Sequence, residues 1–530
     1  VLYATEWDAF GLPNELAALQ AGTSPPEFAR HWIRTMEEQL RRLGISYDWS
    51  RVHSTADPSY YRWTQWLFVE LFERGFVKRR SAILAWCPRC TTTLSRMQSV
   101  GGVCWRCGGR VERRRFPQWF VLTSRFARRL DAGLGHLEQW SATSKRLLRA
   151  FLRSDAGADG RASGGGDWLV SRQRAWGTPI PIVHCDTCGP VPVPRSLLPV
   201  RLPEDLDWSL GSAALASHPS FAATVCPRCT RPARRETDTL DCFFDDIWCF
   251  LSCLSPLGPE FDLGAPDVRA WMPVDRFHSG LDTFHYLHLH RFLGLLLDEW
   301  NVLPGPEPIR SYMGHEMVLS GKRKMSTHLG NTVSPDGPLD RPGADAVRVA
   351  VLWAAGPLRP MVWSNERLER AAAFLDTVHR LNTQWTSVPR AVRGIAIGGL
   401  PSRAARSLAG EVMRAMTRVG KFIEEYRPNA AVEEMAQVAV RLDTFVGRRV
   451  STGRLRSADV EELAGALRDY AIALSPFAPH LAEEIGRLHE AGSLICLRRW
   501  PHPVAADGSL SLLNIPSDAQ GRSSRSIQRE

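Results

Sequence analysis

The sequence predicts an α/β domain with a parallel sheet, interrupted by cysteine-rich insertions and followed by an α-helical bundle. Short apolar runs such as Val1-Leu2-Tyr3 and Met317-Val318-Leu319 have the length of buried strands. Eight of the twelve cysteines fall into four Cys-x-x-Cys pairs, which mark the insertions. From Ser364 to about Trp500, apolar residues recur at the three-to-four-residue spacing of helices.

Length and composition indicate several globular domains. A chain of 530 residues exceeds the size of about 250–300 residues at which a single core stops growing. Its 44% hydrophobic and 9% aromatic content is that of a folded protein. The net charge of +10 suits a polyanionic partner but locates no binding surface. No apolar run reaches the about 20 residues of a membrane span and no signal peptide is recognised, so the predicted compartment is the cytoplasm.

The Cys-x-x-Cys pairs predict two structural zinc sites. Four thiolates from two such pairs can close a tetrahedral Zn²⁺ site, which leaves no open position for chemistry and stabilises a module without a core of its own. A disulfide or redox role is the alternative, which a reducing compartment disfavours. The first predicted site comprises Cys87, Cys90, Cys104 and Cys107, and the second comprises Cys185, Cys188, Cys226 and Cys229.

A basic, glycine-bounded stretch, Gly321–Pro335, follows the apolar run 317–319. At the end of a strand, lysine charge together with serine and backbone N–H groups suits a polyphosphate. An ordinary solvated turn has a similar composition. Residue types alone leave both interpretations open.

The order of residues in this stretch adds a second line of argument. Lys324-Met325-Ser326 is similar to the start of the KMSKS loop of class I aminoacyl-tRNA synthetases. Three further segments, in family order, resemble leucyl-tRNA synthetases: Trp7–Pro13, Asp167–Ile182 and Glu236–Asp241. The resemblance implies a Rossmann-type catalytic domain and an anticodon-side helical bundle.

The resemblance implies a ligase that activates an amino acid, leucine or a similar aliphatic one, with ATP and transfers it to tRNA. Mg²⁺ would accompany the ATP, and a monomer is expected. Asp8 would receive the α-ammonium group, since it follows a strand where doubly wound sheets bind ligands; a turn or N-cap aspartate is the alternative. The implied amino-acid-binding residues are Asp8, Asp245 and Asp282. The implied ATP-binding residues are Met317, Val318, Lys322, Lys324, Met325 and Ser326, of which Lys324 and Ser326 are catalytic.

Some positions depart from the family pattern. Thr327 stands where the KMSKS loop has its second lysine, so Lys322 or Arg323 would have to supply that charge. In the implied amino-acid pocket, Asp246 replaces a small hydroxyl residue and Cys249 a tyrosine. These changes leave the identity of the amino acid open. The histidines between 278 and 290 are expected to lie at the pocket-lining helix rather than to bind a metal.

Two family segments have no counterpart. Residues 152–166 have the composition of a flexible linker where most leucyl enzymes carry an editing domain. No HIGH motif occurs, so we interpret the chain as a fragment that begins inside a strand; a protein that has lost half of its ATP site is the alternative. Two other functions stay open, namely a paralogue that serves a non-tRNA acceptor and a non-catalytic tRNA- or protein-binding relic.

The expected organisation follows the chain. Residues 1–84 begin the catalytic domain, 85–115 form a zinc ribbon inserted in it, and 116–151 lead back to the catalytic domain. Residues 152–166 are the linker, and 167–363 complete the catalytic domain. Residues 364–500 form the bundle, and 501–530 are a polar tail. Bundle helices are predicted at 366–381, 406–426, 430–450, 460–474 and from about Pro479. A further helix is predicted after Ser24, with Phe28, Trp32 and Met36 facing the core.

Overall fold

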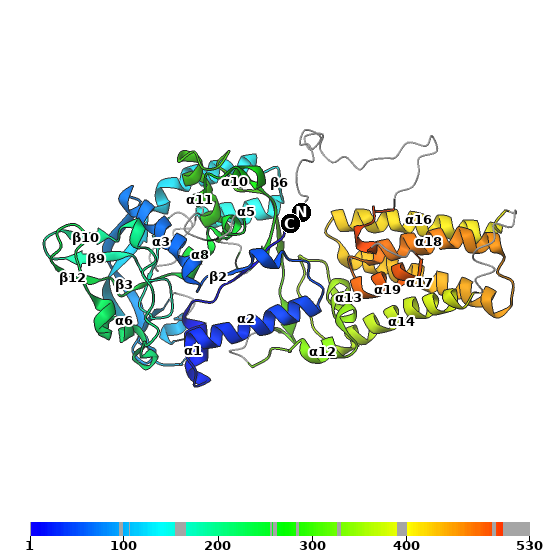
Figure 1. The fold of residues 1–530 in the computed structure, drawn as a ribbon, viewed down its shortest axis with the longest axis horizontal. Coiled ribbons are helices and arrows are strands. Elements are labelled where there is room, and N and C mark those ends of the chain that lie inside the picture. Colours follow the sequence, from blue (N-terminus) through cyan, green and yellow to red (C-terminus); the bar gives the residue numbers. More distant parts are fainter. Residues whose placement is uncertain are drawn as a thin grey trace. The chain divides into compact units, whose positions relative to one another are not determined.

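The computed structural model describes residues 2–94, 99–104, 107–153, 166–254, 257, 262–281, 283, 286–325, 330–388, 400–489 and 494–501. The predicted linker 152–166 and polar tail 501–530 lie almost wholly outside these residues. The chain forms two compact units, one of Val1–Glu38 and Ser46–His315, the other of Gln39–Ile45 and Glu316–Glu530 (Figure 1). None of the helices in the described ranges is long and apolar enough to cross a membrane.

The first unit contains a parallel sheet of order β14-β15-β6, formed by β14 (Val274–Gly280), β15 (Ile309–His315) and β6 (Gln139–Trp140). Helix α11 (Leu287–Glu299) connects β14 to β15, because a parallel pair needs a long crossover. Every residue of α11 from 287 to 297 is buried, so the helix is covered on all sides. The predicted α/β class with a parallel sheet is confirmed. A second parallel pair joins β1 (Glu6–Trp7) to β2 (His53–Ser54).

Antiparallel sheets carry the cysteine pairs. The first has the order β4-β3-β5-β7 and consists of β3 (Val77–Cys87), β4 (Thr92–Leu94), β5 (Glu112–Val121) and β7 (Trp168–Leu169). The second has the order β10-β9-β12-β11 and consists of β9 (Ile182–Cys185), β10 (Gly189–Pro192), β11 (Ala223–Val225) and β12 (Pro232–Arg235). A short pair, β8 (Ser171–Arg172) with β13 (Thr239–Leu240), flanks the second module in sequence.

Helices complete the first unit. They include α1 (Leu12–Gln20), α3 (Pro58–Glu73), α4 (Ala127–Gly133), α5 (Ala142–Leu152), α6 (Ala214–Ser217), α7 (Pro219–Ala222), α8 (Cys242–Asp246), α9 (Cys249–Ser252) and α10 (Pro266–Trp271). Their apolar faces pack with the strands around fully buried side chains such as Tyr60, Trp119 and Trp168. One ion pair is buried with them: Arg291 of α11 donates to both carboxylate oxygens of Glu307, over 2.7 and 2.6 Å.

Helix α2 (Pro25–Arg42) forms as predicted but buries a different face. Trp32 and Met36 are 44% and 38% exposed, so their predicted place in the core is wrong. Ala29 is buried instead, and Ile33 packs against the core. These residues follow the predicted stripe by one position, about 100° around the helix. The spacing showed that a helix is present, but the neighbouring elements decide which stripe is covered.

The second unit combines a small sheet with a helical bundle. The sheet has the order β17-β16-β18 and consists of β16 (Val318–Ser320), β17 (Arg323–Lys324) and β18 (Met361–Val362). The helices are α12 (Asp336–Asp340), α13 (Ala344–Ala354), α14 (Asn365–Ser387), α16 (Arg403–Glu424), α17 (Pro428–Ser451), α18 (Ser457–Leu474) and α19 (Pro479–His489). The five predicted bundle helices are confirmed, with Pro479 in the first turn of α19.

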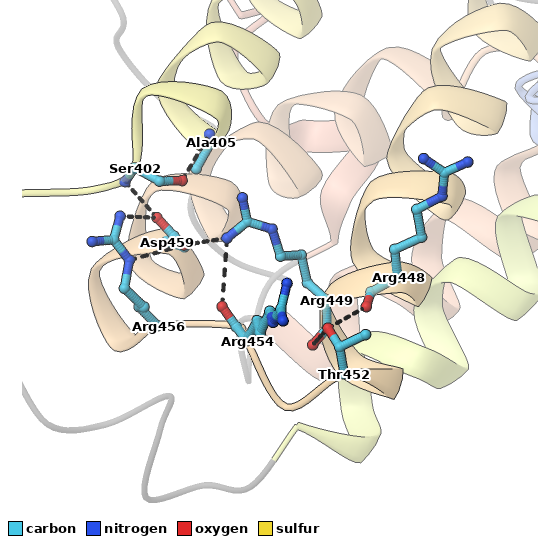
Figure 2. Close-up of polar contacts among 8 residues, drawn as sticks. All are labelled: Ser402, Ala405, Arg448, Arg449, Thr452, Arg454, Arg456 and Asp459. Atoms are coloured by element: carbon cyan, nitrogen blue, oxygen red, sulfur yellow. Dashed lines mark hydrogen bonds and ion pairs between the residues drawn. The ribbon is translucent and has the colours of Figure 1, made fainter.

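A buried carboxylate joins three bundle helices at one end (Figure 2). Asp459, in the first turn of α18, accepts the backbone N–H of Ser402, the N-cap of α16, over 2.6 Å. It also pairs with Arg456 at 3.3 Å and with Arg449 of α17 at 3.5 Å. Burial alone would raise the pKa of Asp459, but the Ser402 N–H and Arg456 outweigh it and lower the pKa.

We expect Asp459→Asn to lower the free energy of unfolding of the bundle by about 2 kcal/mol, because hydrogen bonds to charged groups contribute about 1.5–3 kcal/mol. Urea denaturation followed by circular dichroism measures this, and Glu461→Gln, an exposed neighbour on α18, serves as the control. A pKa that is depressed in the folded state stabilises above the unfolded value and loses that effect as pH falls. The difference between parent and Asp459→Asn should therefore shrink below about pH 4. Equal stability at pH 7 would contradict this role.

Candidate functional site

Asp8 directly follows β1, and the backbone of the next residue, Ala9, is held from two sides. The N–H of Ala9 donates to Thr55 Oγ1 over 3.0 Å, and the indole N–H of Trp176 donates to the carbonyl of Ala9 over 2.7 Å. Trp176 belongs to the Asp167–Ile182 segment, so two of the family-like segments meet here. Asp8 is exposed as a whole residue, whereas its carboxyl group lies close to several protein groups. The carboxylate is thus placed at the end of a parallel strand, where open α/β sheets bind their ligands.

Asp8 belongs to an acidic cluster, whose other members are Glu6, Asp241, Asp245 and Asp246. Surrounding protein groups remove water from the carboxyl of Asp8 and raise its pKa to about 6. Arg174 opposes the rise and Asp241 adds to it. Burial likewise raises the pKa of Glu6 to about 8, against a 2.6 Å hydrogen bond from the Tyr60 hydroxyl. These shifts share one cause, a shortage of water and of positive charge around several carboxylates.

Asp245 lies deeper in the same cluster, on α8. It is fully buried, and the hydroxyl of Thr178 donates to its Oδ1 over 2.7 Å. Burial raises the pKa of Asp245 well above its usual range, although Thr178 opposes the rise. The third predicted amino-acid-binding residue, Asp282, lies outside the described residues. The structure therefore brings Asp8 and Asp245 together and leaves Asp282 unplaced.

The sequence analysis missed Glu6 and Arg174 as members of this site. Both lie beside or within segments that carry the family resemblance, and that position was the available signal. Arg174 donates to the carbonyl of Leu240 over 3.2 Å and opposes the raised pKa of Asp8. Arg172 pairs with Asp241. Five acidic groups thus face two arginines, so the cluster is suited to a cationic ligand.

Glu236 positions the family-like segment that leads to α8. Its Oε2 accepts the indole N–H of Trp119 over 2.8 Å and lies 2.9 Å from His184 Nε2, while the N–H groups of Thr237 and Asp238 donate to Oε1. Burial alone would raise the pKa of Glu236, but His184 and Trp119 outweigh it and hold the pKa at about 2. The carboxylate therefore stays charged and joins β5, β9 and the start of the segment 236–241.

In the second unit, the basic stretch forms a hairpin. Strands β16 and β17 pair antiparallel around Gly321, whose φ of 60° suits glycine in a tight turn. Lys322 lies in the turn and Lys324 in β17, and both are exposed. The side chain of Asn331 donates to the carbonyl of Lys324 over 3.1 Å, which ties the return of the stretch to β17. Ser326, predicted to be catalytic, lies outside the described residues.

The predicted adenine-binding backbone lies beside this hairpin. The carbonyl of Met317 accepts the N–H of Met361 over 3.1 Å, because β16 pairs parallel with β18. The carbonyl of Val318 accepts the N–H of Met325 over 3.4 Å. Both carbonyls are thus engaged in the sheet. A base at this edge would use backbone N–H groups or the second lone pair of a carbonyl.

The eight paired cysteines gather into the two predicted clusters. Zn²⁺ at about 2.3 Å from four sulfurs would place those sulfurs about 3.8 Å apart. The Sγ–Sγ distances are 3.4 Å for Cys87–Cys107, 3.9 Å for Cys90–Cys104 and 3.6 Å for Cys185–Cys229. These exceed the about 2.05 Å of a disulfide, and all the cysteines are free. The donor set and its spacing fit zinc.

The backbone after each Cys-x-x-Cys pair has the same conformation. The next residue has a positive φ in all four cases: Thr91 (46°), Gly108 (65°), Gly189 (71°) and Thr230 (60°). This turn directs backbone N–H groups at sulfur, as in the 3.3 Å contact from the N–H of Cys90 to Cys87 Sγ. Threonine at two of these positions accepts a conformation that costs L-residues about 1–2 kcal/mol.

In the described part of the chain, the groups of side chains that could hold a metal ion are the two cysteine clusters. The described histidines near α11 do not belong to such a group. His290 is buried, donates from Nδ1 to the carbonyl of Ile247 over 3.1 Å, and has its pKa lowered to about 4 by burial. His288 packs on Phe151. His285 lies outside the described residues.

A group of arginines lies at the bundle end that Asp459 organises (Figure 2). Arg449 and Arg456 are engaged by Asp459, whereas Arg448 and Arg454 form no ion pair within the described residues. The guanidinium of Arg449 also donates to the carbonyl of Arg454 over 3.4 Å, which fixes the connection between α17 and α18. The sequence analysis missed this cluster, although four arginines between 448 and 456 were a visible signal.

Two family models match this chain. Residues 23–364 match the tRNA synthetases class I (I, L, M and V), and residues 405–520 match the anticodon-binding domain of tRNA ligase. The leucine–tRNA ligase of Thermotoga maritima is 28% identical over 698 aligned positions that cover 94% of this chain and 83% of the relative. That of Symbiobacterium thermophilum is 27% identical with the same coverage. Both alignments are longer than the chain, so each relative has residues inserted between the segments that align.

Solved structures agree with the family match. The Agrobacterium radiobacter K84 LeuRS, solved as a ternary complex with tRNA and LeuAMS, superposes with a TM-score of 0.82 at 26% identity over 95% of this chain and 82% of its own. The Mycobacterium tuberculosis methionyl-tRNA synthetase, at 16% identity and a TM-score of 0.64 over 92% of this chain and 86% of its own, shares the fold. Because the synthetase model alone covers more than half of its residues, the chain belongs to the class I tRNA synthetases, and its relatives are of the leucyl type.

Proposed function

We propose that the protein activates leucine, or a similar aliphatic amino acid, with ATP and transfers it to tRNA. The observation that carries the proposal is the acidic cluster at the end of β1, with its excess of carboxylates over arginines. An α-ammonium group supplies the missing positive charge there and lowers the pKa of Asp8 toward its usual range. ATP–pyrophosphate exchange tests the first step, and charging of bulk tRNA tests the second.

The chemistry needs little proton transfer. A carboxylate oxygen of the amino acid attacks the α-phosphorus of ATP, the bond to the bridging oxygen breaks, and pyrophosphate leaves with the electron pair. Because the nucleophile is already anionic, the residues serve mainly to position it and to stabilise phosphate charge. We assign Asp8 to the ammonium group and Asp245 to the pocket wall. We assign Lys324 and Ser326 to the phosphates.

Other ATP contacts follow from the hairpin. Lys322 and Met325 lie near Lys324 in the sequence, and Lys322 is exposed at the turn, where it can approach a leaving pyrophosphate. Met317 and Val318 would meet the adenine through their backbone groups. Mg²⁺ bound to the ATP would neutralise part of its charge. Arg323, paired with Ser320 across the hairpin, is the other candidate to replace the family's second lysine.

A different amino acid is the second candidate, and Asp246 favours it. This residue replaces a small hydroxyl residue of the family and adds a carboxylate to the cluster. Burial raises its pKa well above the usual range, with Asp8 and Glu6 adding to the rise. An amino acid with a second ammonium group would relieve that cost. Pyrophosphate exchange with leucine, lysine and ornithine in parallel distinguishes the two candidates.

For tRNA, we propose that Arg448 and Arg454 bind backbone phosphates at the end of the bundle. Both side chains lack an ion-pair partner within the described residues, and Asp459 holds the backbone on which they stand. Arginine suits phosphate because its planar fork donates two hydrogen bonds at once. Such contacts position an RNA without reading its sequence.

We also propose that each cysteine cluster holds one structural Zn²⁺. The metal would close each module by joining its two Cys-x-x-Cys turns, and four thiolates leave it no free position. Each module has only a small core of its own, made largely of the cysteines and a few valines, leucines and alanines. Metal binding would therefore supply most of the module's stability.

We expect Asp8→Asn and Lys324→Ala to change different kinetic constants of pyrophosphate exchange by the complete protein. Asp8→Asn should raise the KM for the amino acid at least tenfold, because the ammonium loses its carboxylate. Lys324→Ala should leave that KM nearly unchanged and lower kcat about 10²–10³-fold, the usual effect of removing one donor to developing charge. In the parent, the KM for the amino acid should fall as pH rises through about 6, since Asp8 must be ionised. A pH-independent KM would contradict the assignment of Asp8.

We expect two zinc ions per chain by mass spectrometry of the native protein. Cys226→Ser should leave one, because three thiolates and a hydroxyl bind zinc poorly, and should make the second module sensitive to protease. Cys496→Ser, at an exposed cysteine outside both clusters, is the matched control and should keep both ions. Retention of two ions by Cys226→Ser would exclude the predicted ligand set.

We expect the Arg448→Gln/Arg454→Gln double variant to weaken tRNA binding about tenfold at 150 mM salt and to leave pyrophosphate exchange unchanged. The slope of log K against log salt should decrease by about 1.4–1.8, because each phosphate contact contributes about 0.7–0.9. Arg418→Gln is the control, since Arg418 is paired with Glu434 at 2.6 Å. An unchanged salt slope would place the RNA elsewhere on the protein.

A further inference from the structure

The second cysteine module borders a cleft of about 620 Å³ that the proposed activation chemistry does not use. The segment 193–205 forms one wall, and α7 and the strands β9, β11 and β12 form the other. Buried Val193 and Phe221 contribute apolar surface. Ser220 and Thr224 contribute hydroxyl groups. The volume lies within the range of about 300–1,000 Å³ that is typical of sites for small ligands or single nucleotides.

Arg235 gives the cleft its charge. It lies on β12 and lines the cleft half-buried, and within the described residues it forms no ion pair. Burial lowers the pKa of Arg235. Arg201, on the opposite wall, is exposed and likewise forms no ion pair in the described part of the chain. A half-buried guanidinium without an anion is costly, and an anionic ligand removes that cost.

One acidic residue also lines the cleft. Asp205 is the acidic residue of the lining, and its carboxylate lies 3.0 Å from His218 Nε2. The surrounding sequence increases the positive field, because residues 223–235 contain four arginines and no acidic residue. A field of this kind favours a polyanion over a lone small anion, since charges beside the cleft also contribute.

We propose that this cleft binds one nucleotide of a single-stranded RNA segment. Arg235 and Arg201 bind its phosphate, the apolar wall covers the base, and Ser220 and Thr224 lie within the lining that a ribose would meet. Single-stranded RNA is suited to such a site because its unstacked bases can enter a pocket. The choice of RNA among polyanions rests on the proposed tRNA substrate. The site itself rests on the cleft and its unpaired arginines.

The neighbouring residue on β12 provides a matched control. Successive residues of a strand point to opposite faces, so Arg234 carries the same charge on the same strand without lining the cleft. A general electrostatic attraction would depend equally on both arginines. Binding in the cleft would depend on Arg235 and not on Arg234. Arg235→Gln and Arg234→Gln therefore distinguish a built site from a basic surface.

The test uses the complete protein and a fluorescein-labelled RNA hexamer of mixed sequence that contains one 4-thiouridine. We expect Arg235→Gln to weaken binding at least fivefold in fluorescence anisotropy, with a salt slope lower by about 0.7. Arg234→Gln should weaken it less than twofold, and Arg235→Lys should restore part of the affinity. Irradiation should cross-link the hexamer to a peptide within residues 193–225, as mapped by mass spectrometry.

Several outcomes would overturn the proposal. Equal losses in Arg235→Gln and Arg234→Gln would show a non-specific surface, and cross-links confined to other segments would place the RNA elsewhere. Competition by AMP as strong as by unlabelled hexamer would assign the cleft to a free nucleotide. Equally strong competition by polyglutamate would assign it to an acidic peptide. Pyrophosphate exchange by Arg235→Gln should equal that of the parent. If the parent shows no exchange but binds RNA through Arg235, the proposed ligase function fails and the nucleotide site stands.

Discussion

One buried carboxylate, that of Glu236, holds the first unit in the arrangement its site requires. It accepts the indole N–H of Trp119 from β5, lies against His184 from β9, and accepts two backbone N–H groups of its own segment. Four donors around one carboxylate outweigh its loss of hydration, so it remains ionised inside the fold. The segment that starts at this point leads to α8, which carries Asp245.

The acidic cluster shows the opposite balance. There five carboxylates face two arginines, and the pKa values of Glu6 and Asp8 rise instead of falling. A structural role favours the first arrangement, in which every lone pair is satisfied. A binding role accepts the second, because the ligand supplies what the protein lacks. The contrast between Glu236 and Asp8, both in family-like segments, separates a residue that holds the fold from one for which we propose a ligand.

Arginines are concentrated in two short segments of the chain. The net charge of +10 gives no location, but four arginines lie between 223 and 235 and four more between 448 and 456. Where a carboxylate is present, as at Asp459, its ion pairs with two of the arginines fix the backbone. Within the described residues, Arg448 and Arg454 in the bundle and Arg201 and Arg235 in the cleft have no such partner, and we propose them as phosphate-binding residues. The fold thus divides similar residues between stability and binding.

The sequence by itself determined the local patterns of this protein. The cysteine spacing predicted both clusters, because a Cys-x-x-Cys turn brings its two sulfurs together without help from distant residues. Helical spacing predicted the bundle helices to within a few residues, and the motif order predicted the leucyl-type family. The tertiary structure decided what depends on neighbours distant in sequence. It turned Trp32 and Met36 outward, since only packing selects which helix face is covered. It added Glu6 and Arg174 to the site of Asp8 and gathered the cleft around Arg235, since charge balance and burial arise only when separate segments meet.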